Sequence, residues 1–399
     1  MKVCVIGNGG REHALAWRLS ISPSVTKVYA IPGSAAMSDC AELVGIDWQQ
    51  SDHLITFLKD NQVDLVVVGP EAPLVAGLAD TLNKAGIPVF GPSKAAAQLE
   101  GSKVFAKDLM KKYNIPTAAY GVFHKVDEAK EFIGQTGAPI VVKADGLAAG
   151  KGVVVAMTVE EANAAVEDML SGNRFGEAGS TVVIEEFMEG EEASLLAFVD
   201  GKTVVPMIAS QDHKRIFDGD KGPNTGGMGT YAPAPVLTDA LRDEAMKTIL
   251  EPMVAAMEKE GMLYVGCLYA GLMITPQGPK VVEFNARFGD PETQVVLPLL
   301  DSDLGQIMMA CATGTLTADM VKWKDSSAAC VILASKGYPE TSSKGDVIHG
   351  DIKQHDTTIV FHSGTKLMGD EYVTNGGRVL GVVGLGKDLR TALDRAYER

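Results

Sequence analysis

The sequence predicts a multidomain protein of the α/β and α+β classes. It should comprise a parallel α/β domain, an α+β core that carries a hairpin flap, and a β-rich C-terminal domain. Three observations support this prediction: strands alternate with helices over residues 1–100, a glycine-rich loop joins two strands at 140–157, and Gly and Thr are frequent after Ser326. The chain has 399 residues, of which 46% are apolar, so it is long enough for two or three domains.

Residues 1–100 are expected to form a parallel sheet with helices on both faces. Strands are predicted at 3–6, 25–31, 63–68 and 89–90, and helices at 12–19, 53–59 and 73–85. Continuous apolar strands that alternate with helices are typical of such a buried sheet. The turn at 91–94 marks the end of this domain.

Residues 101–325 are expected to form the second domain, with a small flap subdomain at about 117–190. Helices are predicted at 103–112, 126–136, 159–170 and 239–259, and strands at 181–186, 193–199, 203–210, 264–274 and 280–284. The polar stretch 212–235 is rich in Gly and Pro and is expected to be a long loop. Long loops are usually functional or disordered.

Residues 326–399 are expected to form a β-rich third domain. Its last segment has apolar residues at helical spacing, at Leu389, Ala392, Leu393 and Ala396, and it lacks a Gly or Asn cap. We therefore expect the chain to stop within or just after a helix, as a truncated chain would.

Charge and cysteine content restrict the function. A net charge of −15 argues against binding to nucleic acids or anionic membranes, which requires a basic surface. The five cysteines contain no C-x-x-C pair, which favours a reduced protein in the cytoplasm. No apolar run approaches membrane-spanning length, and no signal peptide is evident. We expect a monomer or weak dimer that acts on small molecules.

The segment 140–157 places Gly146, Gly150, Lys151 and Gly152 between two runs of β-branched residues. The N–H and ammonium groups of such a loop suit phosphate oxygens. The loop is not a P-loop, because its spacer is one residue short and Gly152 replaces the Ser or Thr that binds Mg²⁺. Since a strand follows where a P-loop opens a helix, we interpret the segment as a hairpin flap over a nucleotide.

A second glycine-rich turn, 7–10, follows the first strand and opens a helix. It is similar to the dinucleotide-binding fingerprint, but Glu12 occupies the third glycine position and no acidic residue ends the second strand. We therefore favour a tight turn over NAD binding. The helix N-terminus could still hold a phosphate, with Arg11 or backbone N–H groups as donors.

The densest polar cluster lies at 283–292. If the strand continues to Arg287, then Glu283, Asn285 and Arg287 share one face, and the other face carries Val282, Phe284 and Ala286. A carboxylate beside an amide oxygen suits Mg²⁺, and an arginine suits a phosphoryl or carboxylate group. The alternative is a solvated strand edge. We favour a site because the apolar face is clean.

Two other polar segments give weaker signals. Residues 185–192 hold several carboxylates at a strand end, either as a solvated acidic turn or as a ribose site beside the flap. The polar stretch 212–235 contains the pair Gly226 and Gly227, which indicates either close approach to a ligand or a flexible insertion. His213 alone is weak evidence for a catalytic base.

Together these segments resemble the ATP-grasp ligases, and among them the phosphoribosylamine–glycine ligase family. The resemblance covers nearly the whole chain. It rests on GNGGREHA at 7–14, VVVGPEAPL at 66–74, GSKVFAK at 101–107, VVKADGLAAGKGV at 141–153, QDHKR at 211–215, GPNTGGMG at 222–229 and EFNARFGDPETQ at 283–294. The last segment is the most specific.

The resemblance implies ATP as a substrate and Mg²⁺ or Mn²⁺ as cofactor. The residues that bind ATP would be Lys103, Lys143, Gly146, Gly150, Lys151, Gly152, Glu185, Glu186, Phe187 and Glu192. The metal ligands would be Glu283 and Asn285, and the catalytic residues Lys143 and Arg287. The substrate side would include Gly9, Gly10, Glu71, Lys214, Asn224, Arg287 and Asp290.

The resemblance also implies the reaction. Glycine attacks the γ-phosphate of ATP, and 5-phosphoribosylamine then attacks glycyl phosphate to give glycinamide ribonucleotide. Such chemistry needs positioning rather than a protein nucleophile, in agreement with the lack of a recognisable catalytic triad. Three alternatives remain open: an ATP-grasp ligase or carboxylase with other substrates, an NAD-linked oxidoreductase, and a nucleotide-binding protein made inactive by a missing C-terminal tail. An oxidoreductase has no use for the cluster at 283–287.

Overall fold

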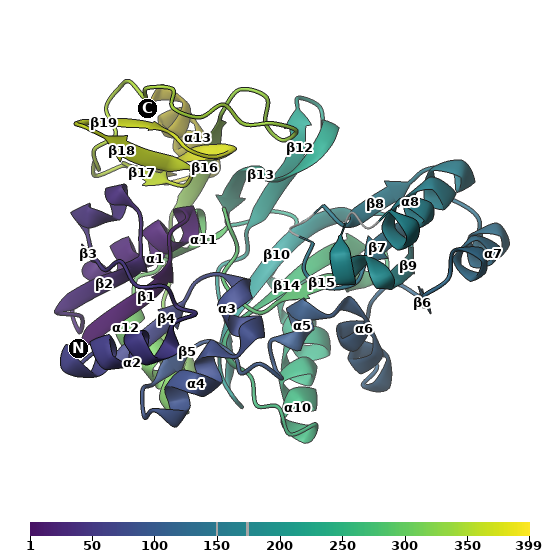
Figure 1. Ribbon diagram of the computed structural model, residues 1–399, viewed down its shortest axis with the longest axis horizontal. Helices are drawn as coiled ribbons and strands as arrows, with labels where there is room; N and C mark the ends of the chain where they lie inside the picture. Colours follow the sequence, from purple (N-terminus) through teal and green to yellow (C-terminus); the bar gives the residue numbers. More distant parts are fainter. Residues whose placement is uncertain (149–150, 173–174) are drawn as a thin grey trace.

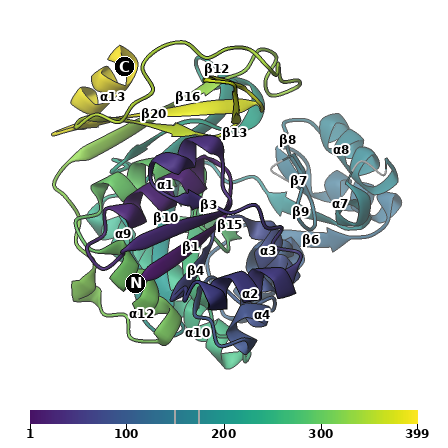
Figure 2. The ribbon, with the colours of Figure 1, turned by 60° about the vertical axis from the view of Figure 1, so that its left-hand side comes forward.

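The computed structural model describes residues 1–148, 151–172 and 175–399. In Figure 1 the N-terminal part lies at the lower left, the C-terminal strands lie above it, and the flap subdomain projects to the right. Figure 2 shows the flap as a separate lobe. It also shows helix α1 (Gly10–Ser20) between the N-terminal sheet and the C-terminal strands.

The N-terminal domain is a parallel sheet with the strand order β3-β2-β1-β4-β5, as predicted. Its strands are β1 (Lys2–Gly7), β2 (Lys27–Pro32), β3 (Glu42–Leu43), β4 (Leu65–Val68) and β5 (Val89–Phe90). Its further helices are α2 (Ser51–Asp60), α3 (Glu71–Ala76) and α4 (Leu78–Lys84). The predicted single helix at 73–85 is wrong, because Gly77 adopts a left-handed φ of 94° between α3 and α4. The sequence does not predict β3, whose two residues are exposed.

The flap subdomain has its own antiparallel sheet, in the order β6-β9-β7-β8. Helices α5 (Gln98–Gly101) and α6 (Lys103–Lys112) lead into it. Its strands are β6 (Tyr120–Phe123), β7 (Ile140–Ala144), β8 (Val153–Ala156) and β9 (Val182–Glu186), and α7 (Val126–Thr136) and α8 (Val159–Ser171) pack on them around a separate apolar core. The predicted hairpin is confirmed, because β7 and β8 pair antiparallel on either side of the glycine-rich loop.

The central sheet has the order β11-β10-β14-β15. Its strands are β10 (Glu191–Asp200), β11 (Val204–Pro206), β14 (Val265–Thr275) and β15 (Gly278–Asn285). The predicted helix at 239–259 consists of α9 (Asp239–Ala245), the π-helical turn η3 (Met246–Leu250) and α10 (Glu251–Lys259). After β15 come α11 (Thr293–Val296) and α12 (Leu304–Thr313), whose apolar side chains join the core beneath the N-terminal sheet.

A bulge interrupts β15 between Val281 and Glu283, where the pairing with β14 shifts register. The extra residue changes which side chains face the core. Val281 and Phe284 are buried, whereas Val282 is partly exposed. The expectation that Val282 packs on the same face as Phe284 is therefore wrong.

The polar stretch 212–235 is a β-hairpin and not the expected loop. Strands β12 (Gln211–Phe217) and β13 (Lys221–Ala232) join β16 (Ser327–Ala334), β20 (Arg378–Gly386) and β17 (Thr358–His362) in the order β12-β13-β16-β20-β17. In β12 the even-numbered residues are partly buried and the odd-numbered residues after Gln211 are exposed. The inner face is nevertheless polar at Asp212 and Lys214, so the period of two is hidden from hydrophobic patterning. This sheet crosses the expected boundary at Ser326, and the domain limits stay a prediction.

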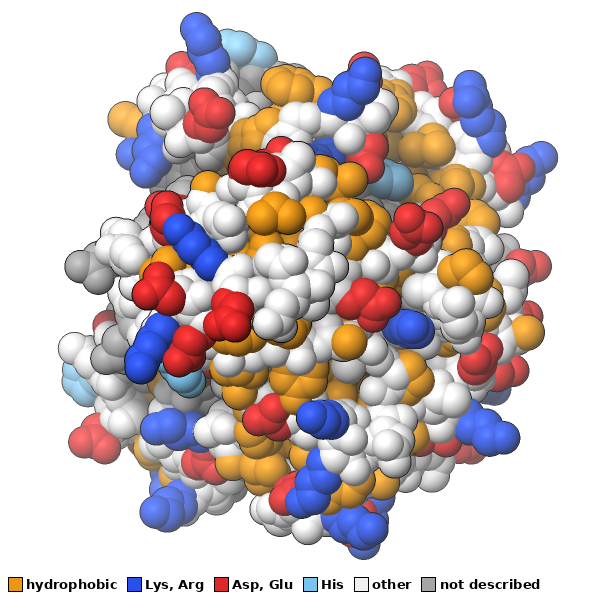
Figure 3. All heavy atoms as spheres, turned by 90° about the vertical axis from the view of Figure 1, so that its right-hand side faces the viewer, with side chains coloured by type: hydrophobic (Ala, Val, Ile, Leu, Met, Phe, Trp, Pro, Cys, Tyr) orange, Lys and Arg blue, Asp and Glu red, His pale blue; other side chains and the backbone are white. Residues whose placement is uncertain are grey.

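The rest of the C-terminal part is β-rich, as expected. A small ladder is formed by β18 (Thr365–Met368) and β19 (Glu371–Thr374), and the predicted final helix is α13 (Leu389–Glu398). All five cysteines are free thiols. In the described ranges no helix is both long and apolar enough to cross a membrane. The face in Figure 3 carries interspersed acidic and basic side chains.

Candidate functional site

The glycine-rich loop after β7 is tied to the start of α6 by Lys103. Its Nζ donates to the carbonyl oxygens of Ala144 (2.8 Å) and Gly146 (2.9 Å). Its backbone N–H donates to Asp145 Oδ1 at 2.6 Å. Burial lowers the pKa of Lys103, although Glu283 nearby raises it. The ammonium group is thus held beside the loop by neutral carbonyls, which phosphate oxygens could replace.

The described residues on the two sides of the loop, Ala148 and Lys151, lie close together before β8. The N–H of Lys151 donates to the carbonyl oxygen of Ala148 at 2.9 Å, and the Lys151 side chain is exposed. A Cβ at Gly152 would lie 2.7 Å from Ala148 Cβ, so the turn requires glycine there. The structure therefore places Gly146, Lys151 and Gly152 in the loop between β7 and β8, while Gly150 lies outside the described residues. Their role in ATP binding stays a prediction.

Below this loop a single carboxylate joins two buried lysines. Glu185 Oε2 lies 2.8 Å from Lys143 Nζ, and Glu185 Oε1 lies 3.1 Å from Lys107 Nζ. Lys143 also donates to the carbonyl oxygen of Val282 at 3.2 Å, which links the flap to β15. Burial lowers the pKa of Lys107 to about 8 despite the attraction of Glu185. Breaking such a buried pair costs about 3–5 kcal/mol, so the network fixes the position of Lys143.

Glu283 and Asn285, the predicted metal ligands, lie on the same face at the end of β15. Their regular pairing with β14 after the bulge makes them neighbours on that face. Burial alone would raise the pKa of Glu283, but the net shift is downward because of three lysines, Lys214, Lys143 and Lys103. The carboxylate therefore stays ionised beside an amide oxygen. These hard oxygen donors fit Mg²⁺ or Mn²⁺.

A second carboxyl group, Glu292, is buried on the same side of β14. Its Oε1 accepts a hydrogen bond from the Tyr269 hydroxyl at 2.9 Å, and that hydroxyl is 2.8 Å from Ser194 Oγ. Burial and the charge of Asp212 raise the pKa of Glu292 to about 7. Within the described part of the chain, Glu292 Oε2 and Asp212 Oδ2 have no hydrogen-bond partner. The sequence motif contains Glu292, but nothing in the sequence alone indicates that it is a buried carboxyl group able to change charge near neutral pH.

Arg287 follows β15 and is held by two carboxylates. Its Nη2 is 2.9 Å from Glu100 Oε1, and its Nε is 3.4 Å from Glu71 Oε2. The other oxygen of Glu100 accepts the N–H of Ala286 at 2.8 Å. Burial favours neutral Arg287, but Glu100 and Glu71 outweigh it and raise its pKa. The structure thus joins the two predicted residues Arg287 and Glu71. It adds Glu100, which no sequence pattern indicates.

Three residues predicted to contact the nucleoside lie where β9 ends and β10 begins: Glu186, Phe187 and Glu192. The N–H of Glu186 donates to the carbonyl oxygen of Ala119 at 2.9 Å, so this N–H is not available to an adenine edge. Glu192 Oε2 lies 3.8 Å from Lys214 Nζ. The structure therefore brings together Glu192 and Lys214, two predicted residues from distant segments. Asn224, also predicted, is exposed on the hairpin of β12 and β13.

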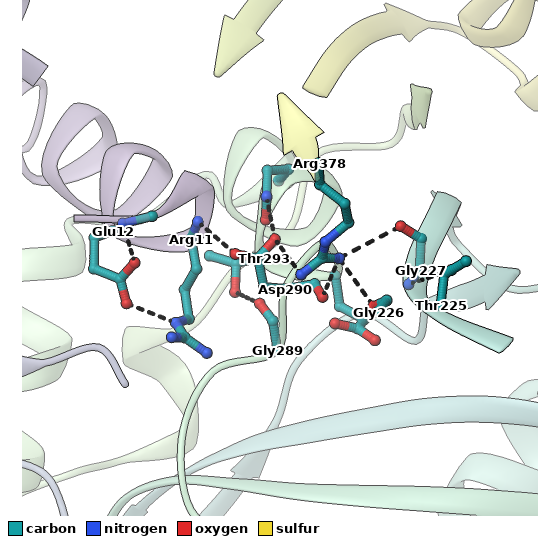
Figure 4. Close-up of polar contacts among 12 residues, drawn as sticks. Arg11, Glu12, Thr225, Gly226, Gly227, Gly289, Asp290, Thr293 and Arg378 are labelled. Carbon is teal, nitrogen blue, oxygen red and sulfur yellow. Dashed lines mark hydrogen bonds and ion pairs between the residues drawn. The ribbon is translucent and has the colours of Figure 1, made fainter. Parts of the chain in front are cut away.

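The first glycine-rich turn is filled by the protein's own carboxylates. The N–H of Gly9 donates to Glu12 Oε2 at 2.8 Å, and the N–H of Arg11 donates to Asp290 Oδ2 at 3.2 Å (Figure 4). The Arg11 guanidinium is paired with Glu12 Oε1 at 2.8 Å and is buried. Because these donors are engaged, the expectation that they hold a phosphate is wrong for this arrangement.

Gly10 and Asp290, both predicted on the substrate side, lie where three parts of the chain meet. A Cβ at Gly10 would overlap Ser363 Oγ of the C-terminal part and lie 2.9 Å from Gln294 Nε2. Asp290 Oδ1 accepts a hydrogen bond from Gln294 at 2.8 Å. Burial would raise the pKa of Asp290, but Arg378 and Arg11 lower it. The carboxylate of Asp290 therefore connects the N-terminal part of the protein, through Arg11, with the C-terminal part, through Arg378.

A pocket of about 510 Å³ lies beside this turn. It is lined by Gly7, Asn8, Pro32, Gly45, Ile46, Asp47, Trp48 and Pro70. These residues lie at or just after the carboxyl ends of β1, β2, β3 and β4, the edge at which open α/β sheets bind ligands. Glu71 follows Pro70, so the pocket adjoins the pair of Glu71 and Arg287.

Comparison with known families matches the chain in three parts. Residues 1–100, 101–293 and 328–399 match the N domain, the ATP-grasp (A) domain and the C domain of phosphoribosylglycinamide synthetase. The chain is 54% identical over 398 residues to the phosphoribosylamine–glycine ligase of Halalkalibacterium halodurans, covering 100% of this chain and 92% of that one. It is 53% identical over 402 residues to the corresponding ligase of Escherichia coli O157:H7, covering 100% and 94%.

Solved structures give the same result. The chain superposes on the phosphoribosylamine–glycine ligase of Thermotoga maritima with a TM-score of 0.86 and 33% identity, over 100% of this chain and 96% of that one. It is also similar to the biotin carboxylase domain of 2-oxoglutarate carboxylase from Hydrogenobacter thermophilus, with a TM-score of 0.75 and 18% identity over 100% and 88%. The second likeness concerns the fold alone. The predicted ATP-grasp fold is confirmed.

Proposed function

Because the chain belongs to the phosphoribosylamine–glycine ligase family, we propose that it joins glycine to 5-phosphoribosylamine with cleavage of ATP to ADP and phosphate. The product would be glycinamide ribonucleotide, an intermediate of purine biosynthesis. The observation that carries this proposal is the arrangement around β15. Glu283 and Asn285 lie beside three lysines, and Arg287 lies beside Glu71 and the N-terminal pocket.

We assign the flap side of the site to ATP. The triphosphate would be neutralised and covered by Lys103, Lys143, Gly146, Gly150, Lys151 and Gly152. Phosphate oxygens would replace the carbonyls that Lys103 now contacts. Glu185 holds Lys143 in place through its side chain. The adenine and ribose would lie against Phe187, the carbonyl of Glu186, and Glu192.

A divalent cation, Mg²⁺ or Mn²⁺, would bind Glu283 and Asn285 and neutralise charge on the β- and γ-phosphates. The surrounding lysines keep Glu283 ionised, so it needs no deprotonation before it binds a cation. The same lysines are near enough to share the phosphate charge. The donor set thus fits the cation that the chemistry requires.

The reaction would proceed in two steps. The carboxylate of glycine attacks the γ-phosphorus of ATP, so that glycyl phosphate forms and ADP leaves. The amine of 5-phosphoribosylamine then attacks the acyl carbon, loses a proton, and displaces phosphate. Arg287, positioned by Glu100 and Glu71, would stabilise the transferred phosphoryl group. Closure of the flap would keep water from the acyl phosphate.

We place 5-phosphoribosylamine on the N-terminal side, in and beside the pocket next to Pro70. Glu71 and Lys214 would approach it from opposite sides. Gly9, Gly10 and Asp290 shape this region through the contacts between domains, and Asn224 would reach it only from the exposed face of the hairpin.

We also propose that the enzyme works in the cytoplasm as a monomer or weak dimer. Its free thiols suit a reducing compartment. Sedimentation equilibrium would measure the oligomeric state directly, and a stable tetramer would contradict this part of the proposal.

Release of ADP from MgATP tests the function. We expect turnover only when glycine and 5-phosphoribosylamine are both present, and little turnover when alanine replaces glycine. Turnover with a different acid–amine pair and none with this pair would contradict the substrate assignment. Tight ATP binding without turnover on any pair would instead identify a nucleotide-binding protein.

A further inference from the structure

Arg378, at the start of β20, reaches from the C-terminal strands to two other segments (Figure 4). Its Nη1 donates to the carbonyl oxygens of Gly226 (2.9 Å), Gly227 (3.4 Å) and Asp290 (3.0 Å). Its Nη2 lies 3.8 Å from Asp290 Oδ1. One side chain therefore contacts both the hairpin β12–β13 and the segment that follows β15.

These contacts explain the glycine pair of the hairpin. A Cβ on Gly226 would lie 2.9 Å from Arg378 Cζ, and a Cβ on Gly227 would lie 2.6 Å from Pro291 Cδ. The close approach that two adjacent glycines indicate is thus an approach of the protein to itself. In this arrangement the pair is neither a flexible insertion nor a surface for a ligand.

The main chain that Arg378 holds leads directly to Lys214. The Thr225 hydroxyl donates to the carbonyl oxygen of Lys214 at 2.7 Å and accepts the N–H of Gly227 at 3.0 Å. Thr225 is therefore the link between the glycine pair and the backbone of Lys214. The ammonium group of Lys214 lies 3.8 Å from Glu192 Oε2, on the side of the site where the nucleoside is proposed to bind.

The same guanidinium also connects the hairpin to the N-terminal domain. Asp290, which Arg378 contacts, accepts the N–H of Arg11 at the start of α1. A second bond from the C-terminal part supports the hairpin, because the Tyr338 hydroxyl accepts the N–H of Gly226 at 3.1 Å. The position of the hairpin is thus set where all three parts of the chain meet.

We propose that Arg378 is a positioning residue for Lys214. By holding the main chain of the glycine pair against Asp290, it keeps the ammonium group of Lys214 beside Glu192. This inference rests on the function proposed above and adds a role for the C-terminal part. The substrate side of the site is complete only when the C-terminal strands are docked.

A double-mutant cycle on kcat for ADP release tests the inference. Arg378→Met is expected to lower kcat about tenfold to hundredfold, because displacing a charge that contacts the substrates by about 1 Å costs that much. The affinity for ADP should be unchanged, and Arg378→Lys should restore part of kcat. In a Lys214→Ala background the same Arg378→Met change should lower kcat less than about threefold. Equal losses in both backgrounds would overturn the inference.

Hydrogen–deuterium exchange without substrates gives a readout that does not depend on the reaction. Arg378→Met should speed exchange in residues 211–232. The control Arg390→Met should not, since Arg390 lies on the exposed face of α13 and pairs with Asp394 at 3.1 Å. Unchanged exchange in Arg378→Met would overturn the inference even if the enzyme ligates glycine. Faster exchange in a protein that lacks glycine-dependent turnover would support the positioning contact and contradict the proposed function.

Discussion

The two glycine-rich turns of this chain look alike in sequence and differ in their partners. At the first turn, the N–H groups of Gly9 and Arg11 donate to the carboxylates of Glu12 and Asp290. At the second turn, Lys103 donates to loop carbonyls, which are neutral. The first turn is therefore satisfied by negative charge from the protein. At the second turn Asp145 accepts the N–H groups of Lys103 and Gly146, but within the described residues the Lys103 ammonium group is bonded only to neutral carbonyls.

This difference shows that a glycine-rich turn alone does not identify a phosphate site. A carboxylate at a helix N-terminus interacts with the helix dipole and the first N–H groups as a phosphate would. Glu12, at the third glycine position of the fingerprint, is the signal in the sequence that the first turn supplies its own anion. The carboxylate at the second turn, Asp145, accepts backbone N–H groups at the start of the loop, and the sequence from Gly146 to Gly152 contains no further carboxylate.

The largest expected effect concerns the second turn and the cation site that it faces. Glu283→Gln should lower ADP release about 100-fold or more, because the carboxylate that would bind the cation is lost. The fold should be unchanged, because glutamine has the same shape as glutamate. The three nearby lysines lose a charged partner but keep their packing. Steady-state kinetics and thermal unfolding together check this. Full activity in Glu283→Gln would remove Glu283 from the cation site.

The next effect concerns the first turn and should appear in stability. Glu12→Ala leaves Arg11 buried without its carboxylate and should lower the free energy of unfolding by about 3–5 kcal/mol. Denaturant unfolding measures it. Glu160→Ala is a suitable control, because Glu160 also lies in the first turn of a helix, α8, but is exposed. Equal effects of the two substitutions would show that the first turn does not depend on its internal anion.

A smaller effect is expected at Gly10. Gly10→Ala should lower the free energy of unfolding by about 1–3 kcal/mol, because its Cβ overlaps Ser363 Oγ. Ser363→Ala removes that oxygen and should restore part of the stability in the double variant. Chemical denaturation of the four proteins measures the coupling. If Ser363→Ala gives no rescue, the C-terminal part does not dock on α1 as described.

The last expected effect is a pH dependence of stability caused by Lys107, below the second turn. The pKa of Lys107 is lowered by burial to about 8, whereas an unfolded lysine titrates near its ordinary value of 10.5. Between these values the unfolded chain binds more protons, so stability should rise with pH, by at most about 1.4 kcal/mol per pH unit. Unfolding of the wild type and of Lys107→Met between pH 7.5 and about 10 checks this. A constant difference between the two proteins across that range would contradict the lowered pKa.

Most elements of the fold could be predicted because their periodicity is carried by apolar residues. The helices at 103–112 and 126–136 have the predicted bounds, and the parallel N-terminal sheet follows from its apolar strands. The hairpin at 211–232 could not be predicted, because Asp212 and Lys214 on its inner face contact a polar site. The bulge in β15 also left no signal, since it depends on pairing with β14.

The residues of the candidate site likewise divide into those that the sequence reveals and those that it does not. Glu283, Asn285 and Arg287 could be found because residues of unlike chemistry are clustered within one short segment. Glu100 and Lys107 could not, because each lies on a helix and gains its role only from a partner distant in sequence, Arg287 or Glu185. Arg378 gave no signal for the same reason.

Hydrogen–deuterium exchange of the wild type with and without MgATP tests the difference between the two turns most directly. The nucleotide should slow exchange in peptides that contain Ala144–Gly146 and the start of β8. Peptides from residues 7–14 should exchange at the same rate with and without nucleotide, because Glu12 and Asp290 already satisfy those N–H groups. Protection of residues 7–14 by MgATP, with none at the loop between β7 and β8, would contradict this account.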